Sequence, residues 1–320
     1  MASLSKFGAF AITDVVYKTV NNQPLKASIL IPKTILEKPE GNCPLLVHWH
    51  GGGFVLGERN YEPWFATWLV QLAEENGAVI INPDYRLLPE VKGVDMLDDI
   101  KDFWAWVRTS LSQEVVKISK DLKVNLSKVA VVGESAGGYL AIQSAFVCPE
   151  IDIKLVISQY GCVDLKIPHF LDPAEAIIRG EPSVPSEASD NVIKKYLKNM
   201  KPGTFRTSEE PGPSPAGRLL YALLQQRRLL EFVGPEKSMC PMELLEDTTK
   251  FPPIWMIHGI DDTTVAKEST TNFYYKLREL CPDVPTLLTL EPGEHSFDAD
   301  VTSDETWVKE SWKFVANHWA

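Results

Sequence analysis

The stretch Val129-Ala130-Val131-Val132-Gly133-Glu134-Ser135-Ala136-Gly137-Gly138 decides the fold of this chain of 320 residues. Its apolar first half predicts a buried strand, and residues 139–147 predict the helix that follows. A serine between glycines at a strand-to-helix turn is typical of a nucleophile elbow. The glycines are required because the turn is strained and the strand and helix approach closely. The stretch therefore predicts that the Ser135 hydroxyl is held out at the end of a sheet.

A second glycine-rich motif follows another apolar strand. His48-Trp49-His50-Gly51-Gly52-Gly53-Phe54 comes directly after residues 44–47. Consecutive glycines leave backbone N–H groups free to point at a developing negative charge. A glycine-rich turn without that role has the same composition. The preferred interpretation is an oxyanion-binding loop.

Two strand-end loops nearer the C-terminus supply the other groups that a nucleophilic serine needs. Residues 254–257 indicate a buried strand, and the loop after it contains Asp261 and Asp262. Residues 286–290 indicate the next strand, and His295 lies in the loop beyond it. Serine, acid and histidine thus occur in the order found in α/β-hydrolases.

These motifs resemble the hormone-sensitive-lipase-like branch of the α/β-hydrolase superfamily, whose members are esterases and lipases. The similar blocks are H-G-G-G at 50–53, D-Y-R-L-L-P-E at 84–90 and G-E-S-A-G-G at 133–138. Glu134 stands where aspartate is commoner in the branch. The resemblance implies an α/β-hydrolase fold, with a mostly parallel central sheet, helices on both faces and a helical cap insertion.

The resemblance also implies roles for individual residues. Ser135 is the expected nucleophile and His295 the expected base. The family spacing H-G-x-x-D-x-x-V selects Asp262 over Asp261 as the acid that orients the histidine. The backbone N–H groups expected to form the oxyanion hole belong to Gly52, Gly53 and Ala136. Neither a metal nor a cofactor is expected.

Residues 163–250 interrupt an otherwise regular alternation of strands and helices. This segment is rich in proline and holds two helical patterns, at about 187–200 and about 216–233. The resemblance places the cap here, within one α/β-hydrolase domain of residues 1–320. A solvated excursion is the alternative, but long insertions in compact domains are usually functional. The leucines expected to line an acyl or alcohol pocket are Leu219, Leu220, Leu223 and Leu224.

The rest of the chain gives a coarse secondary-structure pattern. Residues 13–20 and 25–31 predict an antiparallel hairpin at one sheet edge. Residues 62–76 predict a helix that ends at Gly77, in the C′ position. Apolar residues recur at helical spacing from Met96 to Val107, so we expect that segment to pack one face on the sheet.

Composition narrows the class of protein. A formal net charge of −11 argues against nucleic acid or an anionic membrane surface as partner. No apolar stretch approaches the length of a membrane span. The five cysteines are widely and irregularly spaced, which favours free thiols in a reducing compartment over disulfides or a zinc site. We expect a cytoplasmic protein, monomeric or homodimeric, that acts on a small-molecule acyl substrate.

The predicted function is a serine hydrolase that cleaves carboxylic esters through an acyl-enzyme on Ser135. The same triad also serves transacylases, thioesterases that form lactones or macrocycles, and amide or formamide hydrolases. Pocket shape chooses the acceptor, so the sequence leaves these alternatives open. Some members of this fold are ligand-binding receptors that have lost the histidine, and the presence of both Ser135 and His295 argues against that class.

Overall fold

The computed structural model describes residues 5–38, 42–172 and 176–319. Within these residues the centre of the molecule is an eight-stranded sheet with the order β1-β2-β4-β3-β5-β6-β7-β8. The strands are β1 Phe10–Val20, β2 Gln23–Pro32, β3 Asn42–Trp49, β4 Val79–Pro83, β5 Lys123–Glu134, β6 Ile153–Gln159, β7 Ile254–Gly259 and β8 Thr286–Glu291.

Parallel pairing dominates this sheet. The antiparallel contacts are β1 with β2 and β2 with β4, and every neighbouring pair from β4 to β8 is parallel. Asn21 and Asn22 join β1 to β2 with φ of 49° and 60°, the positive values that the tightest hairpin turns require. The predicted edge hairpin and the mostly parallel sheet are both confirmed.

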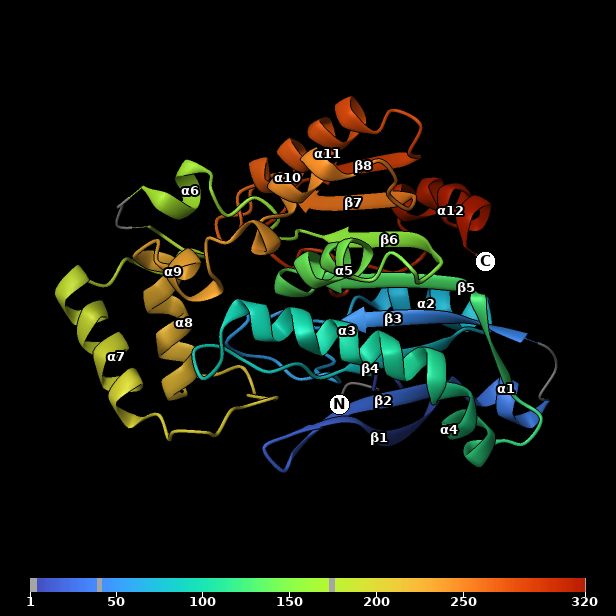
Figure 1. Ribbon diagram of the computed structural model, residues 1–320. Helices are drawn as coiled ribbons and strands as arrows, with labels where there is room; N and C mark the ends of the chain where they lie inside the picture. The colour runs from blue at the N-terminus through green and yellow to red at the C-terminus, as the bar shows by residue number, and fades with distance from the viewer. Residues whose placement is uncertain (1–4, 39–41, 173–175, 320) are drawn as a thin grey trace.

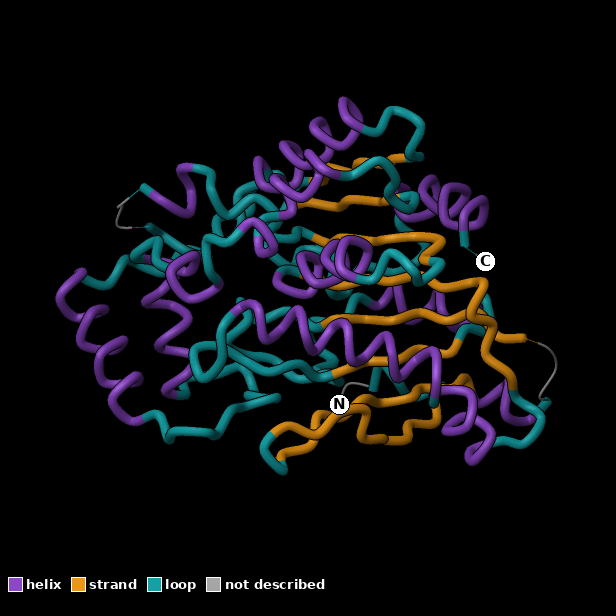
Figure 2. Tube along the Cα trace, in the orientation of Figure 1, coloured by secondary structure: helices purple, strands orange, loops and turns teal. Residues whose placement is uncertain are grey.

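Helices cover both faces of the sheet (Figures 1 and 2). They are α1 Lys33–Glu37, α2 Thr67–Glu75, α3 Gly93–Thr109, α4 Leu111–Ile118, α5 Ala136–Val147, α6 Pro168–Leu171, α7 Ser186–Asn199, α8 Pro215–Gln225, α9 Leu229–Val233, α10 Pro241–Leu244, α11 Glu268–Leu280 and α12 Thr306–His318, with 3₁₀ turns η1 Lys237–Met239 and η2 Leu245–Asp247. Helix α2 is shorter than the expected 62–76, but Gly77 does follow it with φ of 58°.

Successive strand residues enter two different apolar cores, because side chains alternate across a sheet. Val131 packs with α3 and α5 on one face, whereas Val132 packs with α2 and α12 on the other. The second core holds a cluster of tryptophans, in which Trp68 and Trp255 lie 5.2 Å apart between ring centroids. Both faces being covered explains why the central parallel strands contain uninterrupted apolar runs, such as residues 45–47 of β3 and 129–132 of β5.

Helices α6 to α9, in the segment between β6 and β7, lie beyond the carboxyl ends of the parallel strands (Figure 1). Helix α7 matches the first expected pattern and packs against α8. The second pattern, expected as one helix over 216–233, is wrong in one respect. The helix is broken between α8 and α9, where Arg227 adopts φ of 57° and leaves the helical region.

Across the described residues, no helix combines the length and the apolar character that a membrane crossing requires.

Candidate active site

Ser135 lies at a sharp turn between β5 and α5. Its φ is 57° and its ψ is −118°, a conformation that costs a non-glycine residue free energy and is found mostly at functional sites. The Ser135 N–H is bonded to the Gln159 carbonyl on β6 at 2.8 Å, which fixes the turn to the sheet. The sequence-predicted elbow is therefore present, with the Ser135 side chain at the carboxyl end of the strand.

The glycines on either side of Ser135 are required by close packing. A Cβ on Gly133 would lie 2.3 Å from the Gly137 carbonyl, and a Cβ on Gly137 would lie 1.9 Å from the Trp49 carbonyl. Both obstacles are backbone atoms, which cannot rotate away. The strand, the helix and the neighbouring β3 thus approach one another at a distance that only glycine permits.

The loops after β7 and β8 bring Asp262 to His295. The Asp262 Oδ2 atom lies 2.6 Å from His295 Nδ1, and both side chains are buried. The other oxygen, Oδ1, accepts hydrogen bonds from the N–H groups of Thr264 and Val265, each at 2.9 Å. These contacts orient the carboxylate so that one oxygen is directed at the histidine ring.

The electrostatics of Asp262 favour its ionised form. Burial raises the pKa of the Asp262 carboxyl, but His295 and His258 outweigh burial and hold that pKa well below its ordinary value. His258 Nε2 lies 3.2 Å from Asp262 Oδ2 and 2.8 Å from the Val265 carbonyl, so this nitrogen carries the proton. The negative charge that a protonated His295 would need is therefore present before any reaction begins.

Asp261, the competing acid, faces another way. It is exposed, and its Oδ2 accepts a hydrogen bond from the Gly293 N–H at 3.0 Å. The Asp261 N–H is in turn bonded to the Gly293 carbonyl at 3.1 Å. Asp261 thus joins the two loops to each other, whereas Asp262 contacts the histidine.

The glycine loop after β3 presents backbone N–H groups. Gly52 and Gly53 have φ of 103° and 59°, which turn the chain back toward the elbow. Within the described residues, the N–H groups of Gly52, Gly53 and Ala136 have no hydrogen-bond partner. Three unpartnered donors at one end of the sheet can bind an oxyanion.

Glu134 braces this loop through two partners, Gly51 and His48, which the sequence alone did not identify. Its Oε1 accepts a hydrogen bond from the Gly51 N–H at 2.7 Å, and its Oε2 lies 2.6 Å from His48 Nε2. Glu134, the residue before Ser135, is therefore bound directly to the glycine loop after β3. The placement of His48 and Glu134 on adjacent strands was the available signal, since β3 and β5 are neighbours.

His50 is structural in this arrangement. Its ring stacks on Tyr85 at 4.4 Å between centroids, and its Nδ1 lies 2.8 Å from the Gly51 carbonyl. Burial lowers the pKa of His50 to about 4, so the ring is neutral at physiological pH. His50 thus supports the glycine loop as an uncharged side chain.

A second buried carboxylate lies behind the histidine. Asp298 accepts hydrogen bonds from Trp68, Gln159 and Tyr160. The Tyr160 ring packs edge-on against His295 at 4.8 Å between centroids, so this network supports the His295 ring. No motif in the sequence pointed to Asp298, because its partners come from distant segments.

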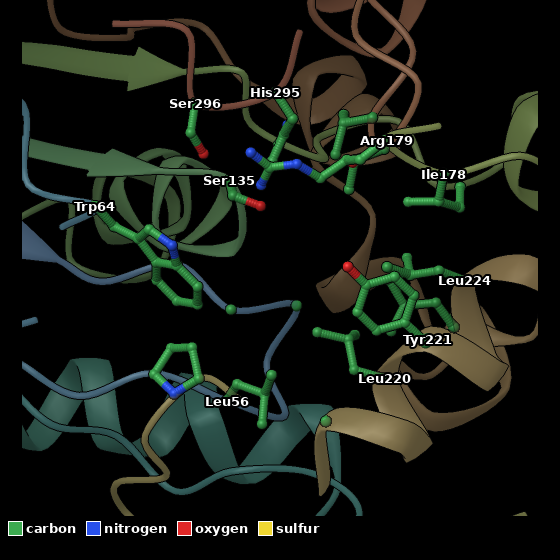
Figure 3. Close-up of a pocket in the computed structure, with 18 of the residues that line it drawn as sticks. Leu56, Trp64, Ser135, Ile178, Arg179, Leu220, Tyr221, Leu224, His295 and Ser296 are labelled. Atoms are coloured by element: carbon green, nitrogen blue, oxygen red, sulfur yellow. The ribbon is translucent and has the colours of Figure 1, made fainter. Parts of the chain in front are cut away.

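The candidate catalytic groups open into one cavity of about 560 Å³. Ser135, His295, Gly52 and Gly53 all line it. Leu220, Tyr221 and Leu224 of α8 line it from the side opposite Ser135 (Figure 3). Within the described residues, no hydrogen bond joins Ser135 to His295 in this arrangement. Such contacts commonly tighten only when substrate binds.

The leucine stripe on α8 is split between two environments. Leu220 and Leu224 line the cavity, as expected (Figure 3). The expectation for Leu219 and Leu223 is wrong, because both are fully buried and neither lines the cavity. The two pairs form adjacent rows along the helix, and α8 packs against α7 as well as over the cavity.

Cys162 is another potentially nucleophilic side chain on the cavity wall. Burial raises the pKa of the Cys162 thiol to about 12, so the thiolate is scarce at neutral pH. Ser135 is therefore the better-placed nucleophile.

Comparison with known proteins agrees with this geometry. Residues 46–209 match the model of a family described by the alpha/beta hydrolase fold. The chain belongs to this α/β-hydrolase family. It is 37% identical over 317 residues to the probable carboxylesterase M8 of Phoma sp., covering 98% of each protein.

The chain is also similar to part of a much longer protein and to a solved structure. Over 165 residues, or 50% of its length, it is 32% identical to the non-reducing polyketide synthase atr1 of Stereocaulon alpinum, of which it covers 6%. It also resembles a solved esterase structure from Rhizomucor miehei, with a TM-score of 0.60 at 20% identity, covering 96% of this chain and 82% of that one. The latter similarity concerns the fold.

Proposed function

We propose that this α/β-hydrolase is a carboxylesterase that forms an acyl-enzyme on Ser135. The observation that carries the proposal is the cavity shared by a strained Ser135 and by His295, whose ring is bonded to the ionised Asp262. A serine, a neutral base and an oriented acid are the groups that acyl transfer to a hydroxyl requires. The relation to a probable carboxylesterase over 98% of the chain supports the same reaction.

In the proposed mechanism, His295 takes the Ser135 proton as the hydroxyl oxygen attacks the ester carbonyl. The positive charge that develops on the His295 ring is stabilised by Asp262 at 2.6 Å. The carbonyl oxygen becomes negative and accepts hydrogen bonds from the N–H groups of Gly52, Gly53 and Ala136. One donor of this kind is worth about 3 kcal/mol of barrier in other hydrolases. His295 then returns the proton to the leaving alcohol, and water repeats the sequence to release the acid.

We also propose that the segment between β6 and β7 acts as a cap that selects the acyl or alcohol group. Leu220 supports this role, because a Cβ added to Gly53 would lie 2.4 Å from its Cδ1 atom. The wall of the cavity thus contacts the oxyanion loop directly. The protein is proposed to be cytoplasmic, since all five cysteines are free and buried. Its oligomeric state, monomer or homodimer, stays a prediction.

A second candidate function is acyl transfer from a thioester. The similarity of half of this chain to part of a non-reducing polyketide synthase is the observation that favours it. Both reactions use the same first step and differ in the leaving group and the acceptor. Product identification with ester, thioester and aryl formamide substrates, in the presence of an alcohol or amine acceptor, separates the alternatives.

The proposed nucleophile is tested with a fluorophosphonate probe followed by peptide mapping. We expect a single labelled residue, Ser135, and we expect Ser135→Ala to abolish both labelling and hydrolysis of p-nitrophenyl butyrate. The thermal unfolding midpoint of this variant should stay close to that of the wild type, since the hydroxyl makes no hydrogen bond within the described residues. Labelling at another serine, or hydrolysis that survives in Ser135→Ala, would refute the proposal.

A further inference from the structure

The cavity is apolar except at a few positions. Its walls include Trp64, Phe170, Ile178, Leu220 and Leu224, which suit a hydrocarbon or aromatic substrate (Figure 3). Charged side chains are therefore conspicuous there. Apart from the proposed base, the charged residues that line the cavity are Glu134, Arg179 and Arg218.

Only one of these charged groups is available near the catalytic groups. Both oxygens of Glu134 are occupied, one by the Gly51 N–H and the other by His48. Arg218 is exposed and lies on α8, where its Nη1 donates a hydrogen bond to the Pro213 carbonyl at 2.8 Å. The remaining charge is the guanidinium of Arg179.

The backbone of Arg179 is fixed to the catalytic loops. Its N–H donates to Thr263 Oγ1 at 2.8 Å, and Thr263 follows Asp262 in the chain. The Thr263 hydroxyl and N–H both donate to Glu294, the residue before His295. One chain of hydrogen bonds therefore joins Arg179 to the loops of the proposed acid and base.

The local conformation of Arg179 also holds it in place. Ile178 and Glu181 form a bridge, and the two residues between them, Arg179 and Gly180, have φ of 52° and 76°. Positive φ at both positions is typical of a tight two-residue turn, in which the first position favours asparagine or glycine over arginine. Backbone strain of this kind is found mostly at functional sites, which favours a functional role for the Arg179 side chain.

Within the described residues, the Arg179 guanidinium makes neither an ion pair nor a hydrogen bond. Arg179 is exposed, so its guanidinium is solvated by water in the free protein. A planar guanidinium offers paired N–H donors that match the two oxygens of a carboxylate. The Arg179 guanidinium would exchange its hydrating water for a substrate carboxylate when substrate binds in the apolar cavity.

We propose that Arg179 binds a carboxylate on the substrate, and that the natural ester therefore carries a negatively charged group in addition to its scissile bond. This inference rests on the proposed function and names the substrate class of the same site. The carboxylate is held at the rim beside His295, while the apolar part of the substrate contacts α8. Arg179 is thus a specificity-determining residue.

The test compares charged and neutral esters. Two charged substrates, p-nitrophenyl hemiglutarate and 4-acetoxybenzoate, carry the carboxylate on the acyl side and on the alcohol side, and their methyl esters serve as neutral matches. In Arg179→Met, we expect kcat/KM to fall roughly 10- to 100-fold for at least one charged ester, since hydrogen bonds to charged groups are strong. The loss should lie mainly in KM, because the contact exists before and during the reaction.

Neutral esters should change less than about threefold in Arg179→Met, within the range of surface substitutions. Arg179→Lys should recover part of the loss, because it keeps the charge but not the paired donors. Arg108→Met is the matched control, since it removes one exposed arginine that does not line the cavity; Arg108 lies near the end of α3 and pairs with Glu150. It should leave every substrate unaffected.

Equal losses on charged and neutral esters, or no loss on any charged ester, would overturn the inference while leaving the esterase proposal intact. Failure of the wild type to hydrolyse any of the esters would instead count against the proposed function. Calorimetric titration of Ser135→Ala with hemiglutarate ester then tests the carboxylate site without turnover. Binding that is not weakened by adding Arg179→Met would overturn the inference.

Discussion

Asp262→Asn, compared with Asp261→Asn, tests the proposed acid most directly. The two residues are adjacent and carry the same charge, but only Asp262 contacts the His295 ring. We expect Asp262→Asn to lower kcat by about 10⁴-fold, the loss seen when the orienting acid of other serine triads is changed in this way. That corresponds to about 5 kcal/mol of transition-state stabilisation.

The magnitude follows from the contacts of the two carboxylate oxygens. Asp262 Oδ1 accepts two backbone N–H groups, and Oδ2 faces the rings of His258 and His295. An asparagine amide has one oxygen, so it can accept hydrogen bonds either from the backbone N–H groups or from the histidine rings, but not from both. If its oxygen stays with the backbone, its NH₂ group faces His295 Nδ1 and forces the ring proton onto Nε2. The nitrogen that should accept the serine proton is then already protonated.

The opposite amide orientation is no better. It restores an acceptor for the histidine rings, but it places the NH₂ group against the N–H groups of Thr264 and Val265. Two donors then lose their acceptor, at a cost of about 1–3 kcal/mol for each buried group. Asp262→Asn is therefore expected to lose activity through the wrong His295 tautomer in the first orientation. In the second it loses stability, and activity falls because a neutral amide lacks the negative charge that stabilises the protonated ring.

The assay is steady-state hydrolysis of p-nitrophenyl butyrate, with thermal unfolding measured in parallel. Asp261→Asn should retain kcat within about threefold of the wild type, because Asp261 only joins two loops at the surface. Similar losses in the two variants would mean that loop structure, and not proton transfer, dominates. A loss below tenfold in Asp262→Asn, with a normal unfolding midpoint, would refute the assignment.

Two further predictions concern the cavity wall and the glycine loop. Leu220→Ala should change the order of kcat/KM among acetyl, butyryl and octanoyl esters. Leu219→Ala should leave that order unchanged and lower the free energy of unfolding, measured in urea, by about 2–5 kcal/mol. The reverse pattern would exchange the roles of the two leucines. The pKa of His50 is about 4, below the ordinary value of 6.5, so the unfolded chain binds the proton first and stability should fall by about 3 kcal/mol between pH 7 and pH 4. Urea titrations should show this component missing in His50→Gln, and an unchanged pH dependence would contradict it.

The sequence could predict where Ser135, Asp262 and His295 lie because each of them follows a strand. Ser135, Asp262 and His295 come after β5, β7 and β8, which are parallel. The carboxyl ends of parallel strands meet at one edge of a sheet, so local motifs were enough to predict proximity. No comparable rule exists for side chains whose partners are distant and follow no motif.

Long-range packing accounts for what the sequence left out. The apolar pattern at 216–233 identified a helical stripe, but both rows of leucines are equally apolar, and only tertiary contacts decide which row faces the cavity. The break at Arg227 carries neither glycine nor proline as a signal. The partners of Glu134 and the whole role of Asp298 were missed for a related reason, since both residues are bonded to other segments of the chain.

The proposed cap is not mechanically independent of the catalytic loops. Leu220 packs on Gly53 of the proposed oxyanion loop, and the Arg179 N–H is bonded to Thr263 beside Asp262, the proposed acid. His169 Nε2 lies 3.1 Å from the Thr264 carbonyl in the same loop. A movement of the cap that admits substrate would therefore remove contacts from both loops at once.

This coupling changes how cap variants must be interpreted. The loops treat every ester alike, so a purely local change in the pocket wall alters chain-length preference and leaves the acetyl ester almost unaffected. A cap substitution that displaces the loops instead lowers kcat for all esters, the acetyl ester included. The acetyl ester therefore distinguishes the two effects, and a selective loss on the longer esters is the result that assigns Leu220 to substrate binding.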